Sequence, residues 1–488
     1  MSGRTLGSIL LVLTIISSGR SRADVLHFAE GGEADVPVVI EGSVVVLDAP
    51  GESLRFPRTD FTRIEVGFDP RRDWPARRDK AMKGGASERL AAALWALDFG
   101  LVPEAVAMIG RAGAVDPEHQ PTARMCDVVN RLKAVLPDPE LAPILRSAPP
   151  GHRLARGPHI LLIHEHSDSE AAERVAILEQ VITAYYLHFS SLGIELAVPQ
   201  HRFPSIWFAK KADYVSFLRG EGAEAFLTTR GYHHPTRGLV VAYDCRDDPP
   251  RKKARIDVDA RRSELDRFAA QVGKLRPGSR VRVSLEGKPP QEIRAEEARD
   301  LHEKLRRQVS RQELVLALGR REIDLGVAAH ETVHQLVAAS HLAPRHDAFP
   351  NWLHEGLAMQ FETIRAGRWA GLSSPSPLRL RDYRRLKTAP SVISTTRDVG
   401  LGRGYQEEGY ARAWALVYYL RSQRPSAFVA ILDGLRLPSD GKEPPGGRSS
   451  RILLDSLRVA PSDEDSRWRR FMLSVVPSPG ETKVSGED

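Results

Sequence analysis

The chain has 488 residues, of which 42% are hydrophobic and 27% are charged, with a formal net charge of +7. This composition is typical of globular proteins and excludes a largely disordered chain, and the length allows two or three domains. The positive charge does not indicate nucleic-acid binding, because residues 251–321, with 20 Lys and Arg against 11 Asp and Glu, carry it with acids and bases intermixed.

The N-terminal residues have the pattern of a targeting segment. Arg4 precedes an apolar run over residues 6–16, and small residues follow, which predicts a signal peptide over residues 1–23. We expect export to the periplasm, the cell surface or the medium, with no stable membrane insertion after cleavage; an uncleaved anchor is the alternative. In an exported protein the only two cysteines, Cys126 and Cys245, permit one disulfide, and the sequence leaves their pairing open.

Short β-branched runs follow the targeting segment. Residues 36–40 and 44–47 are separated by the turn-like Glu41-Gly42-Ser43, which predicts a small β-rich domain over residues 24–75. Residues 84–148 then have a helical pattern whose small residues resemble those of one tetratricopeptide helix pair. A single pair cannot bury its own faces, so this segment is either a packed connector or, with the β-rich domain, a module for a protein partner.

The middle of the chain alternates strand and helix patterns. Between residues 155 and 250 we expect strands near 159–164, 205–209 and 238–243, with helices between them, and hence a mixed sheet covered by helices. Two histidine pairs lie in this part, and isolated histidines are more often structural than metal-binding. They are His164 with His166, on one face of a strand, and His233 with His234, expected in a loop.

Residues 251–321 form a basic helical insertion in which two charged helical patterns flank a hairpin at residues 280–285. Residues 322–476 are mostly helical, and residues 477–488 have a composition typical of disorder. With these parts the predicted fold class is α+β.

The sequence His330-Glu331-Thr332-Val333-His334 carries the clearest chemistry in the chain. Residues four apart share one helix face, so His330 and His334 point two imidazoles at one position, which suits a single zinc ion. Glu331 lies beside them, where its carboxylate reaches a metal-bound water without becoming a ligand, so it is the candidate general base.

The third ligand is expected on a second helix. Glu355 lies in its first turns, after Pro350 and after Asn351 as the expected N-cap. The alternative zinc pattern, His-Glu-x-x-His-x-x-Gly-x-x-His, does not fit, because Val337 stands at its glycine position and Ser340 at its third histidine position. The alternative without a metal site is that both histidines are ordinary polar residues of an amphipathic helix and that Glu355 is a solvated carboxylate.

With these residues in view, the chain resembles the gluzincin metallopeptidases, and among them an uncharacterised secreted bacterial peptidase-MA-like family. The resemblance covers about residues 159–476 without the insertion, and its carriers are the segments 329–336, 350–358 and 410–420. It implies one Zn²⁺ ion held by His330, His334 and Glu355, with Glu331 as base and proton shuttle.

The resemblance also implies an oxyanion donor and a substrate strand. A tyrosine from a later helix would donate to the oxyanion, and Tyr410 is the matching position, with Tyr418 and Tyr419 as competitors. The strand at residues 239–243 is the expected edge strand along which a peptide adds. The usual supporting aspartate is absent, since Met359 occupies its place. Glu362 could support a ligand in its stead, but a solvated carboxylate is favoured.

Two functions follow as expectations. The first is an exported zinc metallopeptidase acting on a peptide or protein substrate. Endopeptidase action is favoured because the chain has no Gly-x-Met-Glu-Asn motif to hold a free N-terminus. The second is a non-catalytic exported binding protein with a structural or idle metal site. The presence of Glu331, the candidate general base, argues against this second function.

Overall fold

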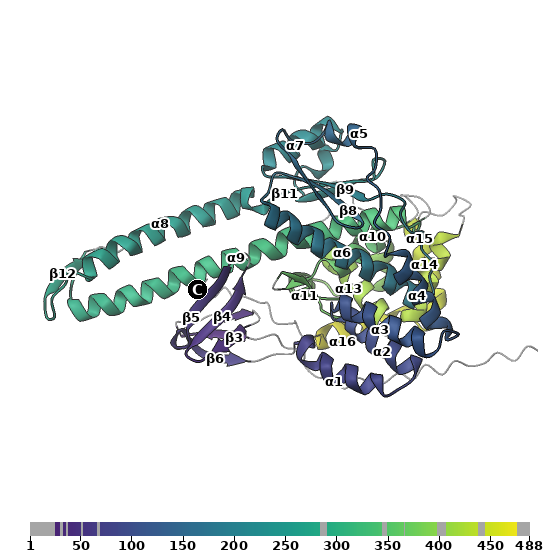
Figure 1. Ribbon diagram of the computed structural model, residues 1–488, viewed down its shortest axis with the longest axis horizontal. Coiled ribbons are helices and arrows are strands. Elements are labelled where there is room, and N and C mark those ends of the chain that lie inside the picture. Colours follow the sequence, from purple (N-terminus) through teal and green to yellow (C-terminus); the bar gives the residue numbers. More distant parts are fainter. Residues whose placement is uncertain are drawn as a thin grey trace, which may run out of the picture.

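The computed structural model has three parts, visible in Figure 1: a small β module, a helical body that contains a five-stranded sheet, and a long helical hairpin that projects from the body. The predicted α+β class is confirmed. The structure describes residues 25–29, 33–35, 38–49, 52–65, 69–283, 290–343, 349–365, 367–397, 407–437 and 445–475. The predicted signal peptide and C-terminal tail lie outside these ranges, and no helix within them is long and apolar enough to cross a membrane.

The β module consists of two three-stranded sheets whose strands lie between Val25 and Glu65. It is shorter than the predicted 24–75, because the side chain of Asp69 caps a helix that begins at Pro70. Its core also contains Leu314 from the projecting hairpin, so the module packs on that hairpin. The strands are β1 (Val25–Phe28), β2 (Glu33–Asp35), β3 (Val38–Glu41), β4 (Val44–Ala49), β5 (Glu52–Pro57) and β6 (Phe61–Glu65).

Five helices follow the β module, and the first three of them lie at the bottom of Figure 1, below the body. Ala93, Ala105 and Met108 are fully buried and belong to the same apolar core as the helices of the body. This shared core is the packing expected of a connector. Cys126 and Cys245 do not form a disulfide. The helices are α1 (Pro70–Met82), α2 (Ala86–Asp98), α3 (Val102–Val115), α4 (Gln120–Arg131) and α5 (Leu141–Leu145).

The mixed sheet of the body has the strand order β10-β11-β9-β8-β7, with β8, β9 and β11 parallel and both edge strands antiparallel to their neighbours. Two predictions here were wrong. The strand at 239–243 is internal, because Gly231–His234 pairs beside it as the edge strand, and His233 and His234 therefore lie on a strand rather than in a loop. The strands are β7 (Arg153–Arg156), β8 (Ile160–His164), β9 (Phe203–Phe208), β10 (Gly231–His234) and β11 (Leu239–Tyr243).

Alternate side chains of the central strands serve two different cores. Leu162 and Trp207 pack in the main core with α6 (Asp168–Ser191) and the long helix α9 (Ala295–Ala339), whereas Ile163 and Ile206 pack with α7 (Lys211–Gly220) on the other face. The period of two along a strand places these neighbours on opposite faces. As a result, α9 lies against one face of the sheet.

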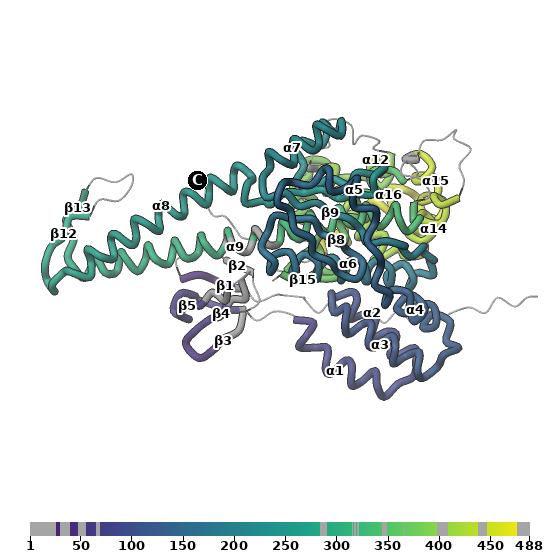
Figure 2. Tube along the Cα trace, turned by 45° about the horizontal axis from the view of Figure 1, so that its top comes forward, coloured from purple at the N-terminus to yellow at the C-terminus, as the bar shows by residue number. Residues whose placement is uncertain are grey.

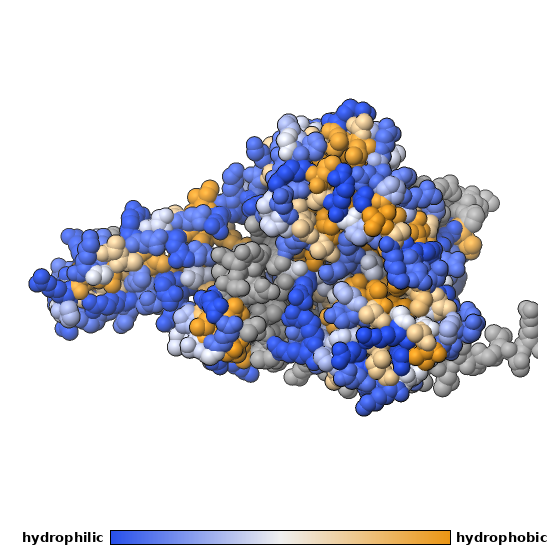
Figure 3. All heavy atoms as spheres, viewed as in Figure 1, coloured by the Kyte–Doolittle hydropathy of each residue, from blue (hydrophilic) through white to orange (hydrophobic). Residues whose placement is uncertain are grey.

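The projecting hairpin is formed by α8 (Pro249–Val272), the strands β12 (Arg280–Val283) and β13 (Gln291–Arg294), and α9 (Ala295–Ala339). Figure 2 shows both helices running away from the body side by side. The predicted boundary between insertion and catalytic part, at residues 321 and 322, falls inside α9, which is one unbroken helix of 45 residues. The visible surface of the hairpin is largely hydrophilic (Figure 3), and ion pairs such as Arg262 with Glu313 join its helices.

The C-terminal part completes the body and packs on the end of α9. Within it, helices α10 (Asn351–Phe361) and α13 (Glu407–Gln423) cross closely at Gly356. The elements are α10 (Asn351–Phe361), β14 (Ile364–Arg365), β15 (Arg368–Trp369), α11 (Pro377–Arg384), α12 (Val392–Arg397), α13 (Glu407–Gln423), α14 (Pro425–Arg436), α15 (Pro445–Leu457) and α16 (Pro461–Ser474).

Candidate metal centre

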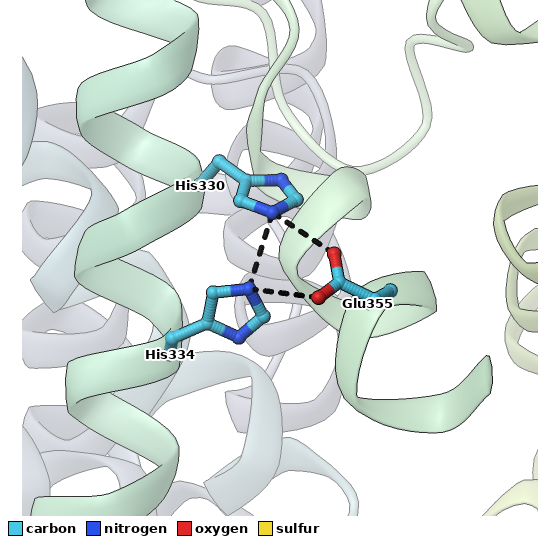
Figure 4. Close-up of side chains that lie close together, drawn as sticks. All are labelled: His330, His334 and Glu355. Carbon is cyan, nitrogen blue, oxygen red and sulfur yellow. Dashed lines mark hydrogen bonds and ion pairs between the residues drawn. The ribbon is translucent and has the colours of Figure 1, made fainter. Parts of the chain in front are cut away.

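Three predicted ligand residues converge between α9 and α10, as Figure 4 shows. The Nε2 atoms of His330 and His334 lie 3.1 Å apart. Glu355 faces both rings, with one oxygen 3.2 Å from Nε2 of His330 and the other 3.6 Å from Nε2 of His334. One donor atom from each residue lies within 4.8 Å of the others. Two imidazole nitrogens and one carboxylate directed at one position are the donor set of a catalytic zinc site with room for a water.

The charges of the three residues also fit a cation. Burial by itself disfavours the charged imidazole of His330, but hydrogen bonds to Glu355 and Glu362 raise its pKa to about 10. Burial likewise opposes ionisation of Glu355, but the adjacent His334 and His330 hold its pKa well below the usual range. Without a metal the site therefore carries a proton on His330, which a bound cation would have to displace.

The position of Glu355 depends on how α10 begins and on which face it buries. Asn351 is the first helical residue and not the N-cap as predicted; Pro350 has that place, and its carbonyl accepts from the amides of Leu353 and His354. Trp352 is buried and donates from Nε1 to Ser449 Oγ at 3.1 Å. The burial of Trp352 fixes the rotation of α10 about its own axis, and in this rotation Glu355 faces α9.

Glu331 lies beside the edge strand β10. A Cβ on Gly231 would lie 2.7 Å from Cγ of Glu331, so only glycine allows the strand and α9 to approach this closely. The backbone amide of His233 donates to the Glu331 carboxylate. Burial raises the pKa of Glu331 against the opposing effect of His330 and His334, which brings the carboxylate nearer to the range of a general base.

Gly231 is a site residue whose role the sequence analysis missed. From the sequence, this stretch is expected to be a loop that contains His233 and His234, whereas in the structure residues 231–234 form a strand with alternating buried and half-buried residues. A glycine at the start of such a run indicates close approach of another element.

The prediction that Glu362 is solvated is wrong. Its side chain is 12% exposed, and Oε2 lies 3.5 Å from Nδ1 of His330. Arg379 donates to both carboxylate oxygens, at 2.8 and 3.1 Å. Burial opposes ionisation, but Arg379 and His330 together lower the pKa of Glu362 to about 2. Glu362 thus contacts the candidate ligand His330 at the place where outer carboxylates contact ligand imidazoles in metal sites.

The structure separates the three candidate tyrosines. Tyr410 on α13 is half-buried, and burial followed by the charges of Glu355 and Glu331 raises its pKa, while the guanidinium of Arg379 lies 5.3 Å from its ring centre. The hydroxyl of Tyr418 instead donates to the carbonyl of Ser373 at 3.3 Å. The hydroxyl of Tyr419 is bonded to Glu464 at 2.5 Å. Tyr410 is the one of the three whose electrostatic neighbours are the metal-site residues.

A second cluster of ligand-type side chains lies six residues earlier on α9. Asp324, Asp244 and Cys245 are buried together, and Nε2 of His166 lies 3.2 Å from Asp244. The guanidinium of Arg174 lies 3.4 Å from Asp324 and 4.0 Å from Asp244, so an arginine already supplies the positive charge. This cluster joins the carboxyl ends of the strands to α9. The cluster supports the expectation that His166 is a structural histidine and not a metal ligand.

The fold and the site define an α+β protein with a two-histidine, one-carboxylate candidate metal centre at a helix–helix contact. Residues 324–439 match the family described as "Protein of unknown function (DUF1570)", which is associated with peptidase-like proteins. This match begins on α9 and contains His330, Glu331, His334, Glu355 and Tyr410. No curated protein matches the chain.

Proposed function

We propose that this protein is an exported zinc metallopeptidase of the gluzincin type. The observation that carries the proposal is the convergence of His330, His334 and Glu355 within 4.8 Å, with Glu331 on the same helix. The similarity of residues 324–439 to a peptidase-associated family is consistent with it. Export rests on the predicted signal peptide at residues 1–23.

Each residue has a separate task in this proposal. His330, His334 and Glu355 hold the ion, which when bound would polarise the scissile carbonyl and acidify a water molecule. Glu331 would take a proton from a water molecule as the water oxygen bonds to the carbonyl carbon, and would deliver it to the amine nitrogen as the C–N bond breaks. Tyr410 donates a hydrogen bond to the oxyanion that forms at the attacked carbonyl.

The substrate is a peptide or protein that pairs with the open edge of the sheet. Tyr243 donates its amide to the carbonyl of Arg230, so in the antiparallel ladder the backbone groups of Gly231 and His233 point away from β11. Two of these groups also have partners within the chain, since the His233 amide donates to Glu331 and the Gly231 carbonyl accepts from Thr229 Oγ1. Gly231 and His233 flank Glu331, which would bring an added strand to the reacting groups. We favour endopeptidase action, because such pairing does not require a free N-terminus.

The experiment compares the purified mature protein with three variants. Metal content is measured by elemental analysis, and cleavage is followed in a peptide library by mass spectrometry. His334→Ala should lose the metal and the activity. Glu331→Ala and Glu331→Gln should keep the metal and lose activity by several orders of magnitude, because they remove only the base.

Two results would contradict the proposal. Equal metal loss in His334→Ala and Glu331→Gln would contradict the assigned division between ligand and base. A wild-type protein that holds zinc and cuts no peptide would favour the second function, a non-catalytic binding protein with a structural metal site.

A further inference from the structure

The two candidate ligand histidines differ in what supports their rings. Nδ1 of His330 lies 3.5 Å from the Glu362 carboxylate. Nδ1 of His334 is buried and has no hydrogen-bond partner among the residues that the structure describes. Histidines that bind metals almost always donate their second ring nitrogen to an acceptor, which fixes the ring plane and the tautomer. His334 lacks this kind of support, so another contact must set the direction of its ring.

A second imidazole makes that contact. The ring of His354 lies on the ring of His334 with their centres 4.1 Å apart and their planes at 21°. This is a stacked arrangement, and it is closer than the 4.8 Å that separates the nearly perpendicular rings of His330 and His334. Aromatic pairs in such geometry add interaction energy beyond that from the apolar area they bury. The stack therefore restrains the His334 ring through its face, whereas a hydrogen bond to Nδ1 would act within the plane of the ring.

The place of His354 on α10 is itself firmly set. Its amide donates to the carbonyl of Pro350 at 3.0 Å, and its preceding neighbours Trp352 and Leu353 are fully buried. Glu355, the next residue, faces the two ligand rings. One helical turn thus carries both the carboxylate and the ring that contacts His334, so a change in the roll of α10 would move both together.

We propose that His354 is a positioning residue that orients the metal ligand His334 by ring stacking. The inference rests on the proposed function, since it concerns the same metal centre. Stacking keeps Nε2 of His334 directed at the position shared with His330 and Glu355, and it lowers the freedom that the ring would lose on binding a metal. His354 needs only a flat ring for this role and not a metal-binding nitrogen.

The test uses three substitutions of His354 in the full-length protein and measures zinc affinity by competition with a chromogenic chelator. His354→Ala should weaken zinc binding about tenfold, in the range found when outer contacts of metal ligands are removed. His354→Phe keeps a flat ring without a nitrogen and should restore most of the affinity. His354→Leu has a similar volume without a flat ring and should not.

A second readout reports the geometry of the site directly. In protein loaded with Co²⁺, the visible absorption bands should shift in His354→Ala and His354→Leu and return in His354→Phe. Thermal unfolding of the metal-free variants separates loss of fold from loss of ring orientation, and His354→Phe should unfold at the wild-type temperature.

Several outcomes overturn the inference. Wild-type affinity in His354→Ala would exclude a positioning role, and equal affinity in the Leu and Phe variants would show packing volume rather than stacking. Loss of zinc in the Phe variant with an intact fold would make His354 a ligand. A wild-type protein that binds neither zinc nor Co²⁺ would overturn the proposed function and this inference with it, whereas the other outcomes leave the metal centre standing.

Discussion

Glu362 Oε2 lies 3.5 Å from His330 Nδ1, and Glu362 is the C-cap of α10, two helical turns beyond Glu355. The carboxylate is held by Arg379, so it is ionised and fixed in direction. One short segment after α9 therefore supplies both a candidate ligand and the support of another ligand.

The first prediction follows from this contact. Glu362→Gln removes the negative charge that favours the ligand orientation of His330, and zinc affinity should fall about tenfold while the fold remains. Chelator competition measures this change. Glu408→Gln is the matched control, because Glu408 is a 40% exposed carboxylate on α13 paired with Arg412. Unchanged affinity in Glu362→Gln would contradict the supporting role.

The second prediction concerns the contact of α10 with α13. A Cβ at Gly356 would lie 2.5 Å from Val417 Cγ2 and 2.8 Å from the carbonyl oxygen of Ala413. Gly356→Ala should lower the free energy of unfolding by about 1–3 kcal/mol, because backbone cannot yield as a flexible side chain does. Denaturant unfolding measures this. Zinc affinity should fall as well, since the displaced helix carries Glu355.

The control for this substitution is another glycine in a helix. A Cβ on Gly110 in α3 meets nothing within 4 Å. Gly110→Ala should be neutral or stabilise by about 0.5–1 kcal/mol, because alanine loses less backbone entropy in a helix. If both variants behaved alike, the close helix contact would not be the cause.

A third prediction distinguishes the tyrosines. In the proposed reaction Tyr410→Phe removes the oxyanion donor, so kcat should fall about 100-fold or more with little change in KM. Peptide hydrolysis under saturating and limiting substrate gives both constants. Tyr418→Phe is the control, because its hydroxyl contacts Ser373. A larger loss of kcat in Tyr418→Phe than in Tyr410→Phe would reverse the assignment.

Acid sensitivity gives a fourth prediction. Burial lowers the pKa of His188 to about 3. The unfolded chain takes up a proton near pH 6.5 and the folded protein does not, so stability from this group is present above pH 6.5 and is lost as the pH falls toward 3. Between pH 7 and 5 the free energy of unfolding should fall about 2 kcal/mol more in the wild type than in His188→Phe.

Denaturant unfolding of the metal-free proteins at several pH values checks this difference, since the metal site then contributes equally to both. His201→Phe, at an exposed position, should keep the acid sensitivity of the wild type. Parallel pH curves for the wild type and His188→Phe would show that His188 is not the source.

The sequence by itself determined the features that depend on neighbours along the chain. The spacing of His330 and His334, the place of Glu331 and the start of the second helix near Glu355 all follow from helical periodicity. The strands near residues 160, 205 and 240 follow from runs of β-branched and aromatic residues. These patterns are local, so they are present before the chain folds.

Tertiary structure decided which distant residues meet. It made Gly231–His234 the edge strand instead of residues 239–243, put Glu362 and Arg379 behind His330, and stacked His354 on His334. It also separated Tyr410 from Tyr418 and Tyr419, because the roll of α13 against α10 selects the face toward the ligands. Contacts of this kind depend on how buried faces pack, and the spacing of residues along one helix or strand does not contain that information.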